Sequence, residues 1–301
     1  MALELLYKLS GIVALITAFY VFKDKEIKSK LGTGLFWLIL AITFLIGEML
    51  PSKVVGIMVL MMGVLTATKQ VNIGKFKETS QEFKIEKSKL LKNKLFIPVL
   101  SIAFFAFVIG QFTSLGGMVG LGVGAIVATT VGLILTKAKP QEALYEGNRL
   151  LQQVGPFGIL PQLLAALGAL FNAAGVGEVI ANGISGVIPA DNIVFGVIAY
   201  CVGMALFTMI MGNAFAAFAV ITAGIGLPFV FNQGADPAIA GALALTAGYC
   251  GTLMTPMAAN FNIVPATVLE MKDKNKLIKI QAPIALTLLA IHIVLMLVWA
   301  F

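Results

Sequence analysis

The part of the sequence best suited to chemistry is an uncharged polar stretch inside an apolar region. Residues 248–266, GYCGTLMTPMAANFNIVPA, hold two threonines, two prolines and two asparagines but no charged side chain. A loop in water would be expected to carry lysine or glutamate, and an ordinary membrane helix does not accept two prolines so close together. The stretch therefore predicts a helix that breaks inside the membrane.

A helix broken at membrane depth predicts a binding site, because only protein or a wet cavity can satisfy its freed backbone groups. The N-termini of half-helices attract carboxylates, and unwound carbonyls coordinate Na⁺ or accept from a proton donor. The alternative is that the polar side chains are only caps and turn formers. We favour substrate binding by four of them: Thr252, Thr255, Asn260 and Asn262.

A second candidate site lies at the centre of a largely apolar segment, residues 192–231. The motif MIMGNAFAAF, 209–218, places Gly212 and Asn213 between two apolar arms. This turn is either a short solvent loop between two full spans or the tip of a re-entrant hairpin, and its lack of charge favours the tip. We expect Asn213 to bind substrate, and Gly212, Asn213 and Thr255 to hold a coupling cation.

The other reactive residue types in apolar runs have structural interpretations. His292, the only histidine, could relay protons, but a hydrogen bond to a neighbouring helix is the commoner role of such a residue. Cys201 and Cys250 are expected to be small core residues rather than a disulfide or metal ligands. The sequence has no metal-ligand cluster, phosphate-binding loop or nucleophile elbow. We therefore expect no enzyme, no metal site and no cofactor other than a coupling ion.

The composition places these candidates in a membrane protein. The chain has 301 residues, of which 59% are hydrophobic and 12% charged, and its mean hydropathy is +0.98. These values lie outside the range of soluble domains. The net charge of +7 is explained by basic cytoplasmic loops rather than by nucleic-acid binding. We predict an all-α polytopic membrane protein with about eight transmembrane helices plus a re-entrant hairpin, one helix being discontinuous.

The basic residues predict the topology. Four segments contain 19 of the 21 basic residues: 23–30, 69–94, 137–149 and 272–279. If all four are cytoplasmic, consecutive spans alternate without conflict, and both termini lie outside the inner or plasma membrane. The first five apolar segments of spanning length are 3–22, 31–50, 54–68, 95–112 and 115–135.

No basic residue lies between Arg149 and Lys272, so the topology there rests on span length. Residues 236–271 are too long for one straight span and too short for two. We expect one crossing whose middle, 251–262, is unwound and whose second half-helix begins near Ile263.

We divide the chain into a scaffold-like region, 1–183, and a transport-like region, 192–301. The first ends with one crossing, 157–183, that leaves the chain outside near PADN. The second is expected to contain the hairpin 192–231, the broken helix 236–271 and a final helix 281–301. Small residues at every fourth position of the last scaffold span before Lys137 predict close helix packing: Gly116, Gly120, Gly124, Ala128 and Gly132.

Two motifs resemble those of a known transporter class. The order Gly-Thr-Leu, Thr-Pro, Asn in GALALTAGYCGTLMTPMAANFNIV resembles the broken helix of the ion transporter superfamily, which are elevator carriers. MGNAFAAFAVITAGIGLP resembles their hairpin tip, with Gly212-Asn213-Ala214 in place of a Ser-Asn-Thr signature, which leaves fewer hydroxyl ligands for sodium. Over its whole length the chain is similar to the larger membrane subunit of the proposed two-subunit 5-oxoproline (pyroglutamate) permeases of bacteria.

The resemblance implies a subunit of a secondary active transporter that takes up a small monocarboxylate, 5-oxoproline, with Na⁺ or H⁺. The absence of arginine and lysine from the site region independently disfavours a dicarboxylate or a phosphate. Such carriers combine two inverted repeats, each with one hairpin and one broken helix, and this sequence has one of each. We therefore expect a second, different membrane subunit in addition to membrane lipid. The alternative is a membrane scaffold or assembly subunit that does not transport.

Overall fold

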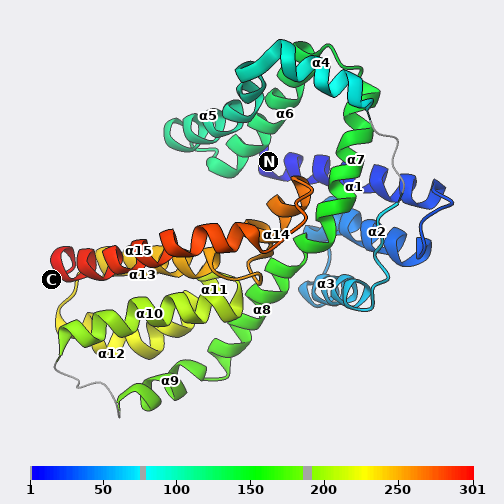
Figure 1. Cartoon of the computed structure of the whole chain (residues 1–301). Helices are drawn as coiled ribbons and strands as arrows, with labels where there is room; N and C mark the ends of the chain where they lie inside the picture. Colours follow the sequence, from blue (N-terminus) through cyan, green and yellow to red (C-terminus); the bar gives the residue numbers. More distant parts are fainter. Residues whose placement is uncertain (1, 75–78, 186–191) are drawn as a thin grey trace. The chain divides into compact units, whose positions relative to one another are not determined.

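The computed structural model describes residues 2–74, 79–185 and 192–301. The protein is 83% helix and forms no strand in these ranges, and Figure 1 shows a chain built of helices throughout. Within the same ranges, eight helices are long and apolar enough to cross a membrane. The predicted class, an all-α multi-pass membrane protein, is confirmed.

The helices form two compact units, residues 1–155 and 156–301, and each is described by itself. The division falls inside helix α7 (Pro140–Gly158) and therefore earlier than the expected boundary at 183. The reason is that α8 (Leu160–Ala173) packs on α11 (Ala214–Ile221) of the second unit. At this contact Gly168 has no Cβ, which lets Ala216 approach closely. A functional division at 183 stays a prediction.

The first unit consists mainly of the expected spans. Besides α7 it contains α1 (Ala2–Lys23), α2 (Lys30–Ile46), a short 3₁₀ turn (Gly47–Met49), α3 (Ser52–Ala67), α4 (Gln81–Leu91), a second 3₁₀ turn (Lys92–Leu95), α5 (Phe96–Phe112) and α6 (Gly117–Thr136). All five apolar segments predicted before residue 137 are helices, with ends that differ from the prediction by a few residues.

Two basic segments that we expected to be loops contain helices instead. One is α4, whose first turn is capped by the Ser80 hydroxyl accepting from Phe83 N. The other is α7, which starts with Pro140 and with Glu142 Oε2 accepting from Lys139 N at 2.8 Å. A capping side chain followed by good helix formers starts a helix even where the overall charge suggests a loop.

The small-residue face of α6 packs against α5 as predicted. A Cβ on Gly120 would lie 2.7 Å from the Ala106 Cα, and one on Gly124 would lie 2.8 Å from the Ile102 Cα. Only glycine permits backbones to come this close.

The second unit contains α8 and α11, the helix α9 (Val176–Ser185), α10 (Ile193–Met211), a π-helix (Thr222–Gly226), α12 (Leu227–Phe229), a 3₁₀ turn (Phe231–Gln233), α13 (Pro237–Leu253), α14 (Ala259–Val268) and α15 (Lys276–Trp299). The segment 157–183 is not one continuous helix: α8 and α9 are separate, and Gly175 between them adopts φ +71°. Its single crossing of the membrane stays a prediction. The expected outer turn at PADN, 189–192, lies outside the described residues except for Asn192.

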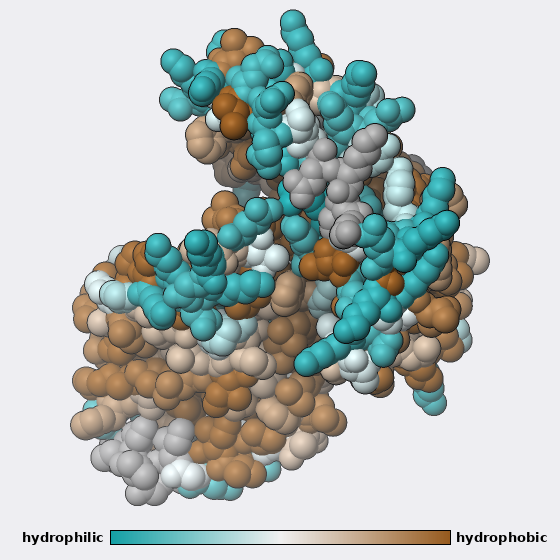
Figure 2. All heavy atoms as spheres, turned by 45° about the vertical axis from the view of Figure 1, so that its right-hand side comes forward, coloured by the Kyte–Doolittle hydropathy of each residue, from teal (hydrophilic) through white to brown (hydrophobic). Residues whose placement is uncertain are grey.

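The core of this unit lies between α10, α13 and α15, where small residues bring helices together. Cys201 and Cys250 are buried free thiols, as expected, and the Cys201 Sγ lies 4.0 Å from the Met296 Sδ. Many large apolar side chains of this unit also point outward, and Figure 2 shows a broad hydrophobic surface over it. Ile210 and Phe215, for example, are 66% and 64% exposed. Such a surface is stable in lipid and would be a liability in water.

Candidate functional site

The hairpin between α10 and α11 turns on two residues. Gly212 ends α10 in the left-handed conformation, φ +68°, with its N–H donating to the Thr208 carbonyl. Asn213 then caps α11: its Oδ1 accepts from Phe215 N at 2.9 Å and from Ala216 N at 3.3 Å. Glycine is favoured where φ is positive, and asparagine is a strong N-cap. The turn at Gly212 and Asn213 is confirmed.

The predicted break in the helix is also confirmed, and it spans Met254 to Ala258. Pro256 has no N–H, so the Thr252 carbonyl loses its usual partner four residues ahead. The Asn262 amide nitrogen replaces that partner and donates to the carbonyls of Thr252 and Thr255, each at 2.7 Å. One buried asparagine thus satisfies two backbone oxygens that the break would otherwise leave without a donor.

The hairpin turn and the break contact one another. The Thr255 hydroxyl donates to the Met209 carbonyl at 2.8 Å and accepts from Met257 N at 3.2 Å. A Cβ on Gly212 would lie only 2.6 Å from the Met257 carbonyl oxygen. The backbone of the turn therefore packs directly on the backbone of the break, and we call this contact the tip–break junction.

The buried oxygens of this unit without a hydrogen-bond partner in the described chain include two beside the hairpin turn and the break: Asn262 Oδ1 and Thr208 Oγ1. Both residues are fully buried. A buried acceptor without a donor costs about 1–3 kcal/mol. Such an oxygen is an unused ligand for a cation or for a proton donor.

The two short helices of the site begin differently. Asn213 caps the N-terminus of α11, whereas no side chain caps the N-terminus of α14 at Ala258. The first N–H groups of a helix point outward and carry partial positive charge. An anionic group could bind at α14, and the exposed residues nearest to it are Met257 and Asn260.

The structure brings most of the predicted site residues together. Gly212 and Thr255 belong to the tip–break junction, and Asn262 donates to the carbonyls of Thr252 and Thr255 in the break. The prediction that 251–262 is unwound is too wide, because α14 starts at Ala259 and contains Asn260 and Asn262. The Thr252 hydroxyl donates to the Tyr249 carbonyl at 2.6 Å, so its visible role is structural. Ligand contacts of these residues, and of Asn213, stay predictions.

Sequence reasoning missed two features of the hairpin. Thr208 gave one available signal, because it is the one threonine in the apolar helix α10 and lies one turn before Gly212. The π-helix at TAGIG, 222–226, follows α11, and Thr222 there shares a hydrogen bond of 2.7 Å with the Tyr200 hydroxyl. A π-helical turn often marks a functional site.

The hydrogen bond of His292 stays within its own helix. His292 Nδ1 lies 2.7 Å from the Leu288 carbonyl of its own helix. The predicted hydrogen bond to a neighbouring helix is wrong, because an imidazole on a helix can reach the carbonyl one turn earlier. Its participation in a proton relay stays untested.

Comparison with known proteins places the whole chain in one family. Residues 4–301 match the family model described as Protein of unknown function (DUF979). No curated protein and no solved structure matches the chain.

Proposed function

We propose that this chain, which belongs to the DUF979 family, is a subunit of a secondary active transporter for a small monocarboxylate. The observation that carries the proposal is the tip–break junction between Gly212 and Met257 and between Thr255 and Met209. Broken helices and helical hairpins that meet inside a membrane are the usual framework of transporter sites. A scaffold subunit would have no need of such a junction.

The chemistry of the junction supports an anionic substrate of low charge. The N-terminus of α14 is uncapped, and the helix dipole there attracts one carboxylate. No arginine or lysine occurs between 150 and 271 to bind a second anionic group. We therefore keep 5-oxoproline, a lactam with one carboxylate, as the proposed substrate. The Asn213 and Asn260 amides would bind its polar groups.

A coupling ion is proposed at the oxygens of the hairpin turn and the break. Backbone at Gly212 and Thr255, together with Asn213, offers oxygen ligands for Na⁺, and the unpartnered Asn262 Oδ1 supports this assignment. The same oxygen could accept from a protonated group, so Na⁺ and H⁺ are both compatible with it. The re-entrant hairpin and the elevator movement are part of this proposal.

A second, different membrane subunit completes the proposed carrier. The chain supplies one tip and one break, whereas a carrier built from inverted repeats needs two of each. A dual-topology dimer of this chain is disfavoured, because 19 of 21 basic residues lie in segments assigned to one side of the membrane. The partner would contribute the inverted half of the site.

Uptake of radiolabelled 5-oxoproline tests the proposal in cells that lack both subunits. We expect uptake only when this chain is expressed together with a membrane protein encoded beside it. Asn213→Ala and Asn260→Ala should each reduce uptake at least tenfold while the amount of protein in the membrane stays unchanged. Uptake by this chain alone would refute the second subunit, and full uptake by both variants would refute the site.

Cysteine labelling from outside the cell tests the proposed topology. In a variant whose native cysteines are replaced, a cysteine at position 233 should react, and one at 80 or at 275 should not. Position 191 is predicted to react as well, although it lies outside the described residues. Labelling of position 80 from outside would contradict the assignment of the basic segments to the cytoplasm.

A further inference from the structure

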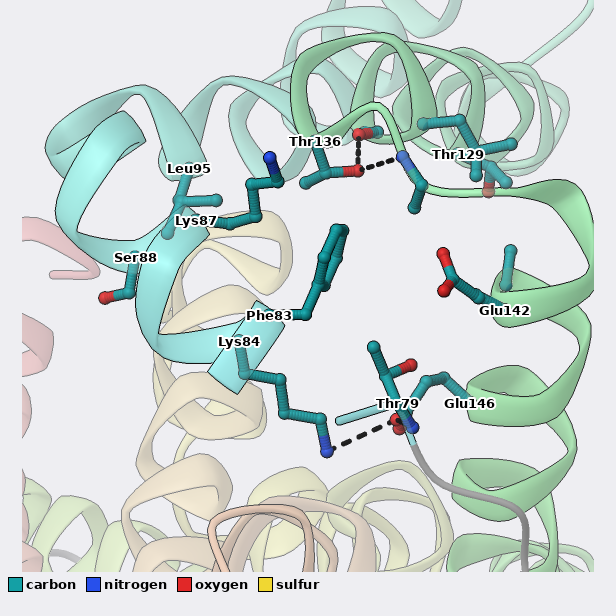
Figure 3. A pocket seen from close by; sticks show the side chains of 14 residues that line it. Thr79, Phe83, Lys84, Lys87, Ser88, Leu95, Thr129, Thr136, Glu142 and Glu146 are labelled. Atoms are coloured by element: carbon teal, nitrogen blue, oxygen red, sulfur yellow. Dashed lines mark hydrogen bonds and ion pairs between the residues drawn. The ribbon is translucent and has the colours of Figure 1, made fainter. Parts of the chain in front are cut away.

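A hollow with charged walls lies in the first unit, away from the tip–break junction. Its volume is about 430 Å³, and it is bounded by α4, α6 and α7. Figure 3 shows Phe83 of α4 pointing into it between Lys87 on one side and Glu142 of α7 on the other. Most of the remaining lining is apolar, including Leu95, Leu133 and Ala143.

The residues of α6 that line the hollow indicate its depth in the membrane. It extends along α6 from Thr136, the last residue of that span, to Thr129. Seven residues of helix correspond to about 10 Å. Lys137 and Lys139 follow Thr136 directly and mark the interface. One end of the hollow therefore lies at headgroup level, and the other lies at the depth of acyl chains.

A second hollow adjoins the first along α6. It has a volume of about 490 Å³ and shares Thr129, Leu133 and Ala143 with the first. Its other walls come from α1 and α7, and they include Val13, Ile16 and Leu151. The shared residues place the two hollows next to one another, and we call their adjoining apolar walls, which reach from the charged walls to α1, the apolar path.

The charged side chains that line the hollow are two cations on one helix and two anions on another. The hollow is lined by two lysines of α4, Lys84 and Lys87, and by two glutamates of α7, Glu142 and Glu146. Lys84 pairs with Glu146 at 3.3 Å across the hollow, which leaves Lys87 and Glu142 to meet a ligand. The Lys87 ammonium pairs with its neighbour Glu86, a carboxylate that is 65% exposed, and such pairs are weak. It also lies 5.1 Å from the centroid of the Phe83 ring.

We infer that this hollow binds one zwitterionic phospholipid whose headgroup carries a primary ammonium, such as phosphatidylethanolamine. The lipid phosphate pairs with the Lys87 ammonium on α4, and the lipid ammonium donates to the Glu142 carboxylate on α7. One acyl chain follows the apolar path past Leu133 and Ala143. The bound lipid bridges α4 to α7 at the membrane surface.

The balanced walls decide between this lipid and an anionic one. The segment around α4 is rich in lysine and would attract any anionic lipid to the surface. A phosphatidylglycerol headgroup inside the hollow, however, would bring no cation to Glu142. A phosphatidylcholine headgroup has the same net charge as phosphatidylethanolamine but has no N–H to donate to that carboxylate. Comparing phosphatidylethanolamine, phosphatidylglycerol and phosphatidylcholine with identical acyl chains therefore separates the ammonium–Glu142 interaction from the phosphate–Lys87 interaction.

Native mass spectrometry of the purified, delipidated full chain tests the inference by titration with these three lipids. We expect phosphatidylethanolamine to occupy the wild-type chain at least fivefold more than either of the others at equal concentration. Glu142→Gln should reduce its occupancy to that of phosphatidylcholine. Glutamine retains the capping bond to Lys139 N, because either side chain accepts at this helix position. Lys87→Gln should lower the occupancy of all three lipids.

Two further variants control for folding and for the apolar path. Gly132→Leu fills the hollow where a Cβ has no neighbour closer than 3.9 Å, and it should lower the binding of every lipid regardless of headgroup. Glu82→Gln removes an exposed carboxylate of α4 outside the hollow and should change nothing. Equal or tighter binding of phosphatidylglycerol to the wild type would overturn the inference, as would an unchanged preference for phosphatidylethanolamine in Glu142→Gln.

Discussion

In the first unit, Gly120 and Gly124 let α6 lie against the backbone of α5 along two unbroken helices, whereas in the second unit Gly212 lets a helix end lie against the broken backbone at Met257. At Gly120 and Gly124 the α5 backbone that lies closest belongs to an unbroken helix and already holds its hydrogen bonds. At the tip–break junction the contact is between helix ends, and side chains must supply the missing partners. Close packing therefore stabilises two intact helices in the first unit. In the second unit it holds two helix ends together, where side chains replace the missing backbone partners.

Gly212→Ala should have the largest effect on stability, because it combines a left-handed residue with a clash against backbone that cannot move aside. A left-handed alanine costs roughly 1–2 kcal/mol, and we expect a total loss of roughly 3–5 kcal/mol with the clash included. Unfolding in mixed detergent micelles, followed by circular dichroism, would measure it. Gly234→Ala is the control, because Gly234 has φ +99° but open space around its Cβ position. Similar losses in both variants would refute the role of the backbone contact.

Asn262→Ala should have the second-largest effect on stability, because it leaves the carbonyls of Thr252 and Thr255 without their buried donor. We expect a loss of roughly 2–4 kcal/mol of unfolding free energy. Asn260→Ala is the matched control: it lies two residues earlier in α14 but is exposed, and it should change stability by less than about 0.5 kcal/mol. If the two variants were equally stable, Asn262 would not hold the break together.

Gly124→Ala tests the close packing of α5 and α6, because its Cβ would meet the Ile102 Cα at 2.8 Å. Pushing α5 and α6 apart should lower stability by roughly 1–3 kcal/mol. Gly132→Ala on the same face adds a methyl in ordinary contact with Pro98, 3.9 Å away, and should be neutral or stabilising by up to about 1 kcal/mol. Uptake should survive in both variants if this helix pair only supports the fold, and a selective loss of transport would contradict that interpretation.

Thr255→Val should have the smallest effect of the four, because it removes one hydroxyl but keeps the shape of the side chain. The Met209 carbonyl would lose its donor, for an expected loss of about 1–2 kcal/mol. Thr255→Ser keeps the hydroxyl and should restore most of that stability. Thr246→Val, at an exposed position in α13 where the hydroxyl bonds only to its own helix, is the control. A Thr255→Val variant as stable as this control would show that the bond to Met209 contributes nothing.

The site illustrates what local sequence signals can predict. Gly212 and Asn213 predicted a turn, and Pro256 predicted a break, because each residue acts on the backbone next to it. The same reasoning missed the buried Thr208 hydroxyl and the π-helix at 222–226, because neither is caused by a residue that breaks a helix, such as glycine or proline. It also predicted too wide a break, because it took Asn260 and Asn262 as unwound polar residues. The first turn of α14 tolerates both.

The sequence by itself determined the membrane class, most helix positions, the small-residue face of α6 and the two places where helices end inside apolar segments. Composition, span length and the chemistry of glycine and proline act over short distances and are therefore visible in the residues. Only the tertiary structure decided that Thr255 reaches Met209, that Asn262 serves the carbonyls freed by the break, and that α8 belongs with the second unit. These contacts join residues from different helices, and which donor meets which acceptor depends on how the helices pack.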